Sequence, residues 1–248
     1  MNFREKKAIL FDKDGTLMQF IPFWVPVAKA AIRRMVLSHA FGHENLSDMI
    51  SAAEKAIGIE GDGLLPDGIL LGGTYGQTAD TIGDVLRQFG VMCDITRKET
   101  VAAFETGLSE GKIVPVCENL REKLKRAKRA GIHLFLVTTD NPQITDRCLR
   151  ALRIRDLFDS VFCDDGFRPA KPSPLIAEEI LRLSRWKAAD LCMVGDTVTD
   201  MKFAKNAGIE AICVGDNEAA REMADDRFAD AGVFLDSLLQ SEKEAATA

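Results

Sequence analysis

The chain has 248 residues, a formal net charge of −6 and an isoelectric point near 5.3. Its basic stretch at residues 121–129 has the spacing of a solvated helix face, so we expect neither nucleic acid nor a membrane surface as a partner. Apolar residues make up 46% of the chain and charged residues 28%, which is typical of a globular protein. The length suits a core domain with a smaller insert, in a monomer or a homodimer.

The cysteines and the first residues both indicate a cytoplasmic protein. The six cysteines form no Cys-x-x-Cys pair, and Cys163, Cys192 and Cys213 lie in short apolar runs, as expected in a reducing compartment. Residues 1–7 are polar and charged with no apolar run behind them, so we expect no secretory signal. Residues 15–28 are uncharged, but they contain two prolines and are shorter than the roughly 20 residues of a membrane span.

A short apolar run at residues 9–11 leads directly into Asp12-Lys13-Asp14-Gly15-Thr16. We interpret the run as a buried strand that ends in a tight polar loop. Along an extended backbone Asp12 and Asp14 point the same way, whereas Lys13 points away from them and has no evident task. Two adjacent carboxylates repel each other, so either the pair shares a proton or a hard cation such as Mg²⁺ lies between them.

The segment at residues 20–111 has helical patterns. Apolar spacing predicts helices over 27–39, 46–57, 78–89 and 96–108, the last behind a capping box of Thr96 and Glu99. The glycine-rich residues 58–76 are expected to be a loop-rich connection, and we find no convincing strand between 18 and 112. Because the segment is too long for a loop, we predict a helical domain at 20–111, inserted between the two parts of a core formed by 1–19 and 112–248.

Strands alternate with helices from residue 116 onward. A charged helix ends at Ala130, and strands are predicted at 132–137, 160–163, 191–194 and 211–214. Further helices are predicted from Pro142, from Pro174 to Leu183 and up to about Ala207. This alternation is typical of βαβ units, so the predicted fold class is α/β, with a Rossmann-like parallel sheet flanked by helices.

Chemically active side chains gather at the ends of these predicted strands, which is where open α/β sheets bind their ligands. They are Asp12 with Asp14, Thr138, Lys171, and Asp196 with Asp200. Phosphoryl transfer requires a carboxylate nucleophile, a metal ion and donors for the phosphoryl oxygens, and this set contains groups for each task.

The chain resembles the haloacid dehalogenase (HAD) superfamily, in particular its phosphoglycolate-phosphatase-like branch, in motifs that occur in the family's order. These are Asp12-Lys13-Asp14-Gly15-Thr16, Thr138, Lys171-Pro172-x-Pro174 and Gly195-Asp196-x-x-x-Asp200. The resemblance covers residues 6–24 and 112–236, and the segment between them resembles the helical C1 cap by position and length. It implies a HAD-like core, a cap domain and a phosphatase that works through a phosphoaspartate.

The resemblance also implies a role for each catalytic residue. Asp12 attacks phosphorus, and Asp14 protonates the leaving oxygen and then deprotonates the attacking water. Thr138 donates a hydrogen bond to a phosphoryl oxygen, and Lys171 neutralises charge on the nucleophile and the phosphate.

The implied cofactor is Mg²⁺, held by Asp12, Asp196 and Asp200 and by the backbone carbonyl of Asp14. The acid at position 14 also separates branches of the superfamily. Halide-displacing relatives lack it, and transport ATPases have threonine there and preserve their phosphoenzyme. Asp14 therefore favours rapid hydrolysis.

Candidate substrate-binding residues lie mainly in the helical segment, because C1 caps present a loop over the core site. Thr74 and Tyr75 lie in such a loop, and Arg33 could bind an acidic group of the substrate. In the core, Thr139 follows Thr138 directly.

These observations predict a cytoplasmic, Mg²⁺-dependent phosphatase that acts on a small phosphorylated metabolite, phosphoglycolate-like or a sugar phosphate. One alternative is a phosphomutase of the same fold, which would return the phosphoryl group to a sugar rather than to water. Another is a non-catalytic binding protein on the HAD fold. Release of free phosphate without a bisphosphate primer would separate the first two.

Overall fold

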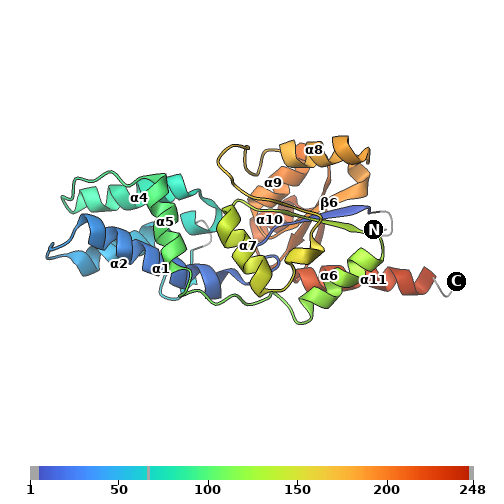
Figure 1. Ribbon diagram of the computed structural model, residues 1–248, viewed down its shortest axis with the longest axis horizontal. Helices are drawn as coiled ribbons and strands as arrows, with labels where there is room; N and C mark the ends of the chain where they lie inside the picture. The colour runs from blue at the N-terminus through green and yellow to red at the C-terminus, as the bar shows by residue number, and fades with distance from the viewer. Residues whose placement is uncertain (1–5, 66–67, 246–248) are drawn as a thin grey trace. The chain divides into compact units, whose positions relative to one another are not determined.

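The computed structural model describes residues 6–65 and 68–245. The chain divides into two compact units, one formed by residues up to Gln19 and from Ile113 onward, the other by Phe20–Lys112. The first unit contains a six-stranded sheet, and the second is mainly helical (Figure 1). Within the described ranges, no helix combines the length and the apolar character that crossing a bilayer requires.

The sheet of the first unit is parallel throughout, which confirms the predicted α/β class. Its strands, in spatial order, are β5 Ser160–Phe162, β4 His133–Val137, β1 Ala8–Phe11, β6 Leu191–Gly195, β7 Glu210–Val214 and β8 Asp226–Phe228. Strand β1 is central, with Phe11 in register with Leu136 of β4 and Val194 of β6. The chain fills one side of β1 and then crosses to the other, so the topological switch point lies between β1 and β6.

Helices cover both faces of this sheet, and all four residues of β1 are therefore buried. They are α6 Leu120–Arg129, α7 Pro142–Ala151, α8 Leu175–Ser184, α9 Val198–Ala207, α10 Glu218–Met223 and α11 Ala231–Ala245, with short 3₁₀ turns η2 Arg155–Leu157 and η3 Ala188–Asp190. Ile9 and Phe11 belong to a core with residues of α6 and α11, whereas Ala8 and Leu10 belong to a core with residues of α8 and α9. Figure 1 shows these two helix layers on opposite sides of the sheet.

The second unit is built around a long helix, α1, which packs against α2 and α5. Its elements are α1 Phe20–His39, α2 Leu46–Ala56, β2 Ile59–Glu60, β3 Gly63–Leu64, α3 Ile69–Gly72, α4 Tyr75–Gln88 and α5 Arg97–Gly107. The predicted capping box at the start of α5 is confirmed, since Thr96 and Glu99 bond each other's backbone amides.

Helix α1 begins seven residues before the predicted start at residue 27. We expected the prolines to delay it, but Pro22 lies in the first turn, where a missing amide hydrogen is tolerated. Pro26 lies inside the helix and cannot donate to the carbonyl of Pro22. That carbonyl accepts a hydrogen bond of 2.9 Å from the amide of Lys112 instead, which explains why the helix continues.

The expectation of no strand between residues 18 and 112 is wrong. Strands β2 and β3 form an antiparallel pair, with Ile59 opposite Leu64 and Glu60 opposite Gly63. Gly61 in the turn has a φ of 59°, the left-handed conformation that glycine adopts readily. Two residues per strand are too few to show an alternating pattern, which is why the sequence did not reveal the hairpin.

Strand β8 and helix α11 complete the first unit, and neither was predicted from the sequence. Phe234 of α11 is fully buried. Its ring packs edge-on against Phe11 at 6.4 Å and against Phe228 at 5.4 Å. Helix α11 therefore holds the central strand and the edge strand in one core.

We expect Phe234→Ala to lower the free energy of unfolding by about 3–5 kcal/mol, because it removes a buried ring from this core. The neighbouring Val233 is 46% exposed, so Val233→Ala should change stability by no more than about 0.5 kcal/mol. Denaturant unfolding of both variants measures the difference. Equal effects would show that α11 is not anchored through Phe234.

Candidate active site

The first part of the site is the loop that follows β1. The amide of Asp12 donates to the carbonyl of Val194 at 2.9 Å, which extends the pairing of β1 with β6 by one residue. Gly15 then turns the chain with a φ of 78°. A Cβ at position 15 would lie 2.0 Å from Oδ2 of Asp196, so only glycine allows the loop to approach that carboxylate so closely.

The second part is the end of β6 and the start of α9. The Thr16 hydroxyl donates to Oδ1 of Asp196 at 3.1 Å, which links the two loops. Asp200 has two functions at once. Its Oδ2 accepts from the amide of Thr197 at 3.0 Å and from the hydroxyl at 2.6 Å, completing a capping box, while its Oδ1 faces Lys171.

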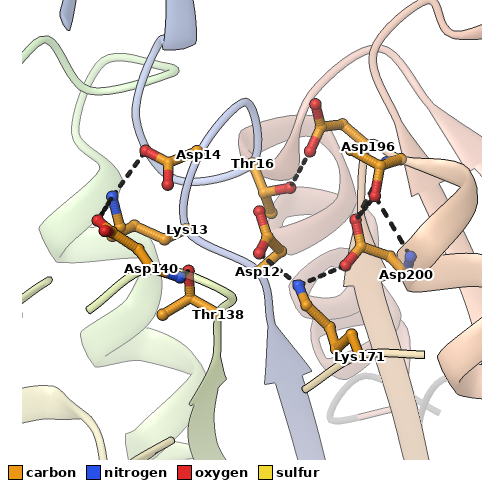
Figure 2. A network of polar contacts seen from close by, with 10 residues as sticks. Asp12, Lys13, Asp14, Thr16, Thr138, Asp140, Lys171, Asp196 and Asp200 are labelled. Atoms are coloured by element: carbon orange, nitrogen blue, oxygen red, sulfur yellow. Dashed lines mark hydrogen bonds and ion pairs between the residues drawn. The ribbon is translucent and has the colours of Figure 1, made fainter. Parts of the chain in front are cut away.

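Lys171 joins the two parts of the site. Its Nζ lies 2.5 Å from Oδ1 of Asp12 and 2.6 Å from Oδ1 of Asp200, and its side chain is almost fully buried. Figure 2 shows the ammonium group between these two carboxylates. The resemblance gave Lys171 the role of neutralising charge on the nucleophile, and the structure places its ammonium group against the Asp12 carboxylate.

Three carboxylates converge at this point. Asp12, Asp196 and Asp200 each offer an oxygen, and the three oxygens lie within 4.8 Å of one another. Burial raises the pKa of Asp12 even though Lys171 opposes the shift. Burial, with the charges of Asp12 and Asp200, raises the pKa of Asp196 well above its usual range. Three carboxylates thus face one ammonium group, so their full ionisation is unfavourable without a further cation, and their oxygens are the donors that a hard divalent cation prefers.

Thr138 lies at the end of β4 and is buried. Its amide donates to the carbonyl of Phe162 at 2.9 Å, so the residue continues the ladder between β4 and β5. Its hydroxyl accepts from the amide of Asp140 at 3.2 Å. The adjacent Thr139 is exposed.

The predicted orientation of Lys13 is wrong. We expected it to point away from both acids, but its Nζ lies 2.7 Å from Oδ1 of Asp14 and 3.1 Å from Oδ2 of Asp140. The turn at Gly15 breaks the alternation that an extended strand would have. Burial alone would lower the pKa of Lys13, but Asp14 and Asp140 raise it above its usual range. Asp12 and Asp14 therefore contact different lysines, Lys171 for Asp12 and Lys13 for Asp14, and each lysine also contacts a second carboxylate.

The other substrate-binding candidates lie in the helical unit. Arg33 is exposed on α1. Thr74 is the N-cap of α4, and its hydroxyl accepts from the amide of Gln77 at 3.2 Å. The Tyr75 ring packs edge-on against Phe104 at 5.4 Å. Thr74 and Tyr75 thus have structural contacts that the sequence analysis did not foresee.

A comparison with models of protein families shows the family of the chain. A family model described as haloacid dehalogenase-like hydrolase matches residues 6–208. The chain belongs to this family. The match includes all the strand-end residues described above, so the recognition from sequence motifs is confirmed.

Relatives and solved structures of HAD-like hydrolases agree with this assignment. A phosphoglycolate phosphatase from Vibrio vulnificus (strain CMCP6) is 28% identical over 210 residues, which is 84% of this chain and 83% of that protein. A predicted phosphoglycolate phosphatase from Haemophilus somnus 129pt has the same fold, with a TM-score of 0.66 and 21% identity, covering 94% of this chain and 97% of that one. A protein from Bacillus subtilis, YfnB, described as a predicted HAD-hydrolase and solved bound to magnesium, has a TM-score of 0.61 at 15% identity, and the match covers 94% of this chain and 98% of that one.

Three features of this HAD-like site were missed in the sequence. Thr16 was noticed only as a hydroxyl in the first motif, yet it orients Asp196. Asp140 was not singled out, although it closely follows Thr138 at a strand end. The pairing of Asp140 with Lys13 depends on how β4 lies beside β1, which local sequence does not encode.

Asp196 should destabilise the metal-free protein at neutral pH. The pKa of Asp196 in the folded protein lies above the unfolded value of 3.8. As pH rises from 3.8 toward the folded pKa, the unfolded chain ionises Asp196 more readily than the folded protein does, so the stability present at low pH is lost. We expect Asp196→Asn to stabilise the protein in EDTA at pH 7.5 by about 1–2 kcal/mol, roughly 2–8 °C in Tm, and by less at pH 5. The exposed Asp80→Asn is the control. A gain that did not depend on pH would contradict this account.

Proposed function

We propose that this protein is a Mg²⁺-dependent phosphatase that hydrolyses a small phosphomonoester through a phosphoaspartate on Asp12. The observation that carries the proposal is the buried group of Asp12, Lys171, Asp196 and Asp200 at the switch point of the sheet. Membership of the HAD-like hydrolases and the named phosphoglycolate phosphatases among the relatives support it.

Asp12 is the nucleophile. An aspartate anion and a phosphate dianion repel each other, so the attack requires compensating positive charge. Lys171, 2.5 Å from the Asp12 carboxylate, supplies part of that charge and fixes the orientation of the carboxylate. A carboxylate oxygen of Asp12 forms the new bond to phosphorus, and the substrate oxygen departs with the electrons of the bond that breaks.

A divalent cation bound here would balance the charge on the attacking and transferred groups. The donor set of Asp12, Asp196 and Asp200 fits such an ion, since it consists of three carboxylates that face one ammonium group. Magnesium is the ion bound in the B. subtilis structure with the same fold. The Thr16 hydroxyl keeps Asp196 turned toward this position.

Asp14 moves the protons. In the first step it gives a proton to the departing substrate oxygen, and in the second it takes a proton from the water that attacks the phosphoaspartate. The bond from phosphorus to Asp12 then breaks and inorganic phosphate leaves. The Thr138 hydroxyl, which follows the strand next to β1, donates to a phosphoryl oxygen in this mechanism.

We further propose that the helical unit serves as a cap that selects the substrate, with Arg33, Thr74 and Tyr75 as contacts and Thr139 as a contact from the core. The insertion point supports this, because the unit starts directly after the loop that carries the two acids. Phosphoglycolate is the leading substrate because of the named relatives, and a sugar phosphate is the next. The six free cysteines support a reducing, cytoplasmic location.

Purified protein with Mg²⁺ should release phosphate from p-nitrophenyl phosphate and from one or more compounds in a panel of phosphorylated metabolites, without a bisphosphate primer. EDTA should abolish the release. Asp12→Asn should lower turnover by at least about 10³-fold because it removes the nucleophile, whereas Asp80→Asn should not. Wild-type turnover in Asp12→Asn would overturn the mechanism, and a requirement for a primer would indicate a mutase.

The cap assignment predicts a separation of kinetic constants. Arg33→Ala and Tyr75→Phe should raise KM for the metabolite found in the panel by about tenfold, while kcat for p-nitrophenyl phosphate stays within about twofold. Tyr75→Phe keeps the ring that packs on Phe104, so it tests the hydroxyl alone. Unchanged KM values in both variants would remove these residues from the substrate site.

A further inference from the structure

Lys13 is the long side chain next to the nucleophile for which the mechanism above has no task. It is fully buried, and its ammonium group contacts the carboxylates of Asp14 and Asp140 at 2.7 and 3.1 Å. A buried lysine is rare unless it is paired, and removal of one partner from such a group is strongly destabilising. The side chain is thus held firmly in one place.

Asp140 is the fixed end of this arrangement. It is buried in the turn that follows β4, and its amide donates to the Thr138 hydroxyl at 3.2 Å. Its Oδ1 accepts from the amide of Asn141 at 2.7 Å, so backbone groups set the direction of the carboxylate. The other oxygen, Oδ2, lies 3.1 Å from the Lys13 ammonium. Lys13 is therefore positioned by the turn that follows β4, the strand paired with β1.

Asp14 is the more exposed end of this arrangement. It lies beyond the end of β1, immediately before the left-handed turn at Gly15, and its side chain is 15% exposed, against 4% for Asp140. A carboxylate at such a position would otherwise be able to sample several rotamers. The contact with Lys13 links it to Asp140, which is fixed by backbone hydrogen bonds.

The two lysines of the site act on different acids. Figure 2 shows Lys171 among Asp12 and Asp200 on one side, and Lys13 between Asp14 and Asp140 on the other. The site thus has one cation for the nucleophile and a second for the residue that transfers protons.

We propose that Lys13 is a positioning residue that holds the Asp14 carboxylate in its proton-transfer geometry, with Asp140 as the anchor of Lys13. The inference rests on the proposed function, in which Asp14 activates the water that attacks the phosphoaspartate. A catalytic carboxylate must be held within a fraction of an ångström, and supporting side chains provide this precision. The alternative is a purely structural role, in which Lys13 only balances the buried charge of Asp140.

A double-mutant cycle between Lys13 and Asp14 separates these roles. With p-nitrophenyl phosphate and Mg²⁺, we expect Asp14→Asn to lower kcat by about 10²–10⁴-fold and Lys13→Met by about 10–10²-fold. If Lys13 acts through Asp14, Lys13→Met in the Asp14→Asn background should lower kcat by no more than about threefold. The same large factor in both backgrounds, or no effect of Lys13→Met in the wild type, would overturn the proposal.

The phosphoenzyme gives a second readout. The substrate has a good leaving group, so Asp12 can still be phosphorylated when Asp14 is misplaced, with release of p-nitrophenolate. Water attack on the phosphoaspartate then lacks its base. Intact mass measured after acid quench should show phosphorylated protein accumulating in both Lys13→Met and Asp14→Asn, but not in the wild type. A Lys13→Met variant that is slow without phosphoenzyme would contradict the proposal.

A control for folding removes the Asp140 carboxylate, whose charge Lys13→Met leaves without a partner. The double variant Lys13→Met/Asp140→Asn has no buried carboxylate left without its cation, so its Tm should match that of the wild type. Low turnover with accumulated phosphoenzyme in the folded double variant supports positioning, whereas recovered turnover would show that Lys13 only balances Asp140. Failure of the wild type to release any phosphate would instead overturn the proposed function, and it would be seen before any substitution is made.

Discussion

The close approach of three carboxylates at the carboxyl ends of β1 and β6 is the constraint on which the rest of the site depends. Strands β1 and β6 are neighbours, so Asp12 and Asp196 are brought together by the same ladder that builds the fold. Burial makes their mutual repulsion strong. The fold tolerates it through Lys171, the Thr16 hydroxyl and the two glycines at positions 15 and 195, which leave no Cβ where a carboxylate must lie.

The sequence predicted the positions of those site residues that follow the carboxyl ends of parallel strands. The carboxyl ends of parallel strands meet at one edge, so polar residues after separate apolar runs could be assigned to one place without knowing the strand order. This reasoning brought Asp12, Asp196, Asp200 and Lys171 together, and the structure places all four in contact range. Thr138 follows the same rule from β4, on the other side of β1.

Sequence was uninformative where a contact depends on geometry that no local pattern carries. The direction of Lys13 follows from the turn at Gly15 and from the position of β4, not from alternation along β1. Helix α1 passes through Pro26 because a distant amide, that of Lys112, satisfies the carbonyl left without a donor. The hairpin of β2 and β3 is too short for any periodicity. For Lys13 and helix α1 a contact with a distant part of the chain overrides a correct local rule, whereas the hairpin leaves no pattern to which a rule applies.

Asp200 belongs to the site and to the scaffold at the same time. One of its oxygens closes the capping box at the start of α9 and the other receives Lys171, so replacing it would disturb the start of a helix along with the acid cluster. A loss of activity in such a variant would have two causes that kinetics cannot separate, which makes Asp196 the cleaner position for mutagenesis. It also means that a descendant of this protein that had lost its catalytic activity would still be under selection to keep an acid at position 200.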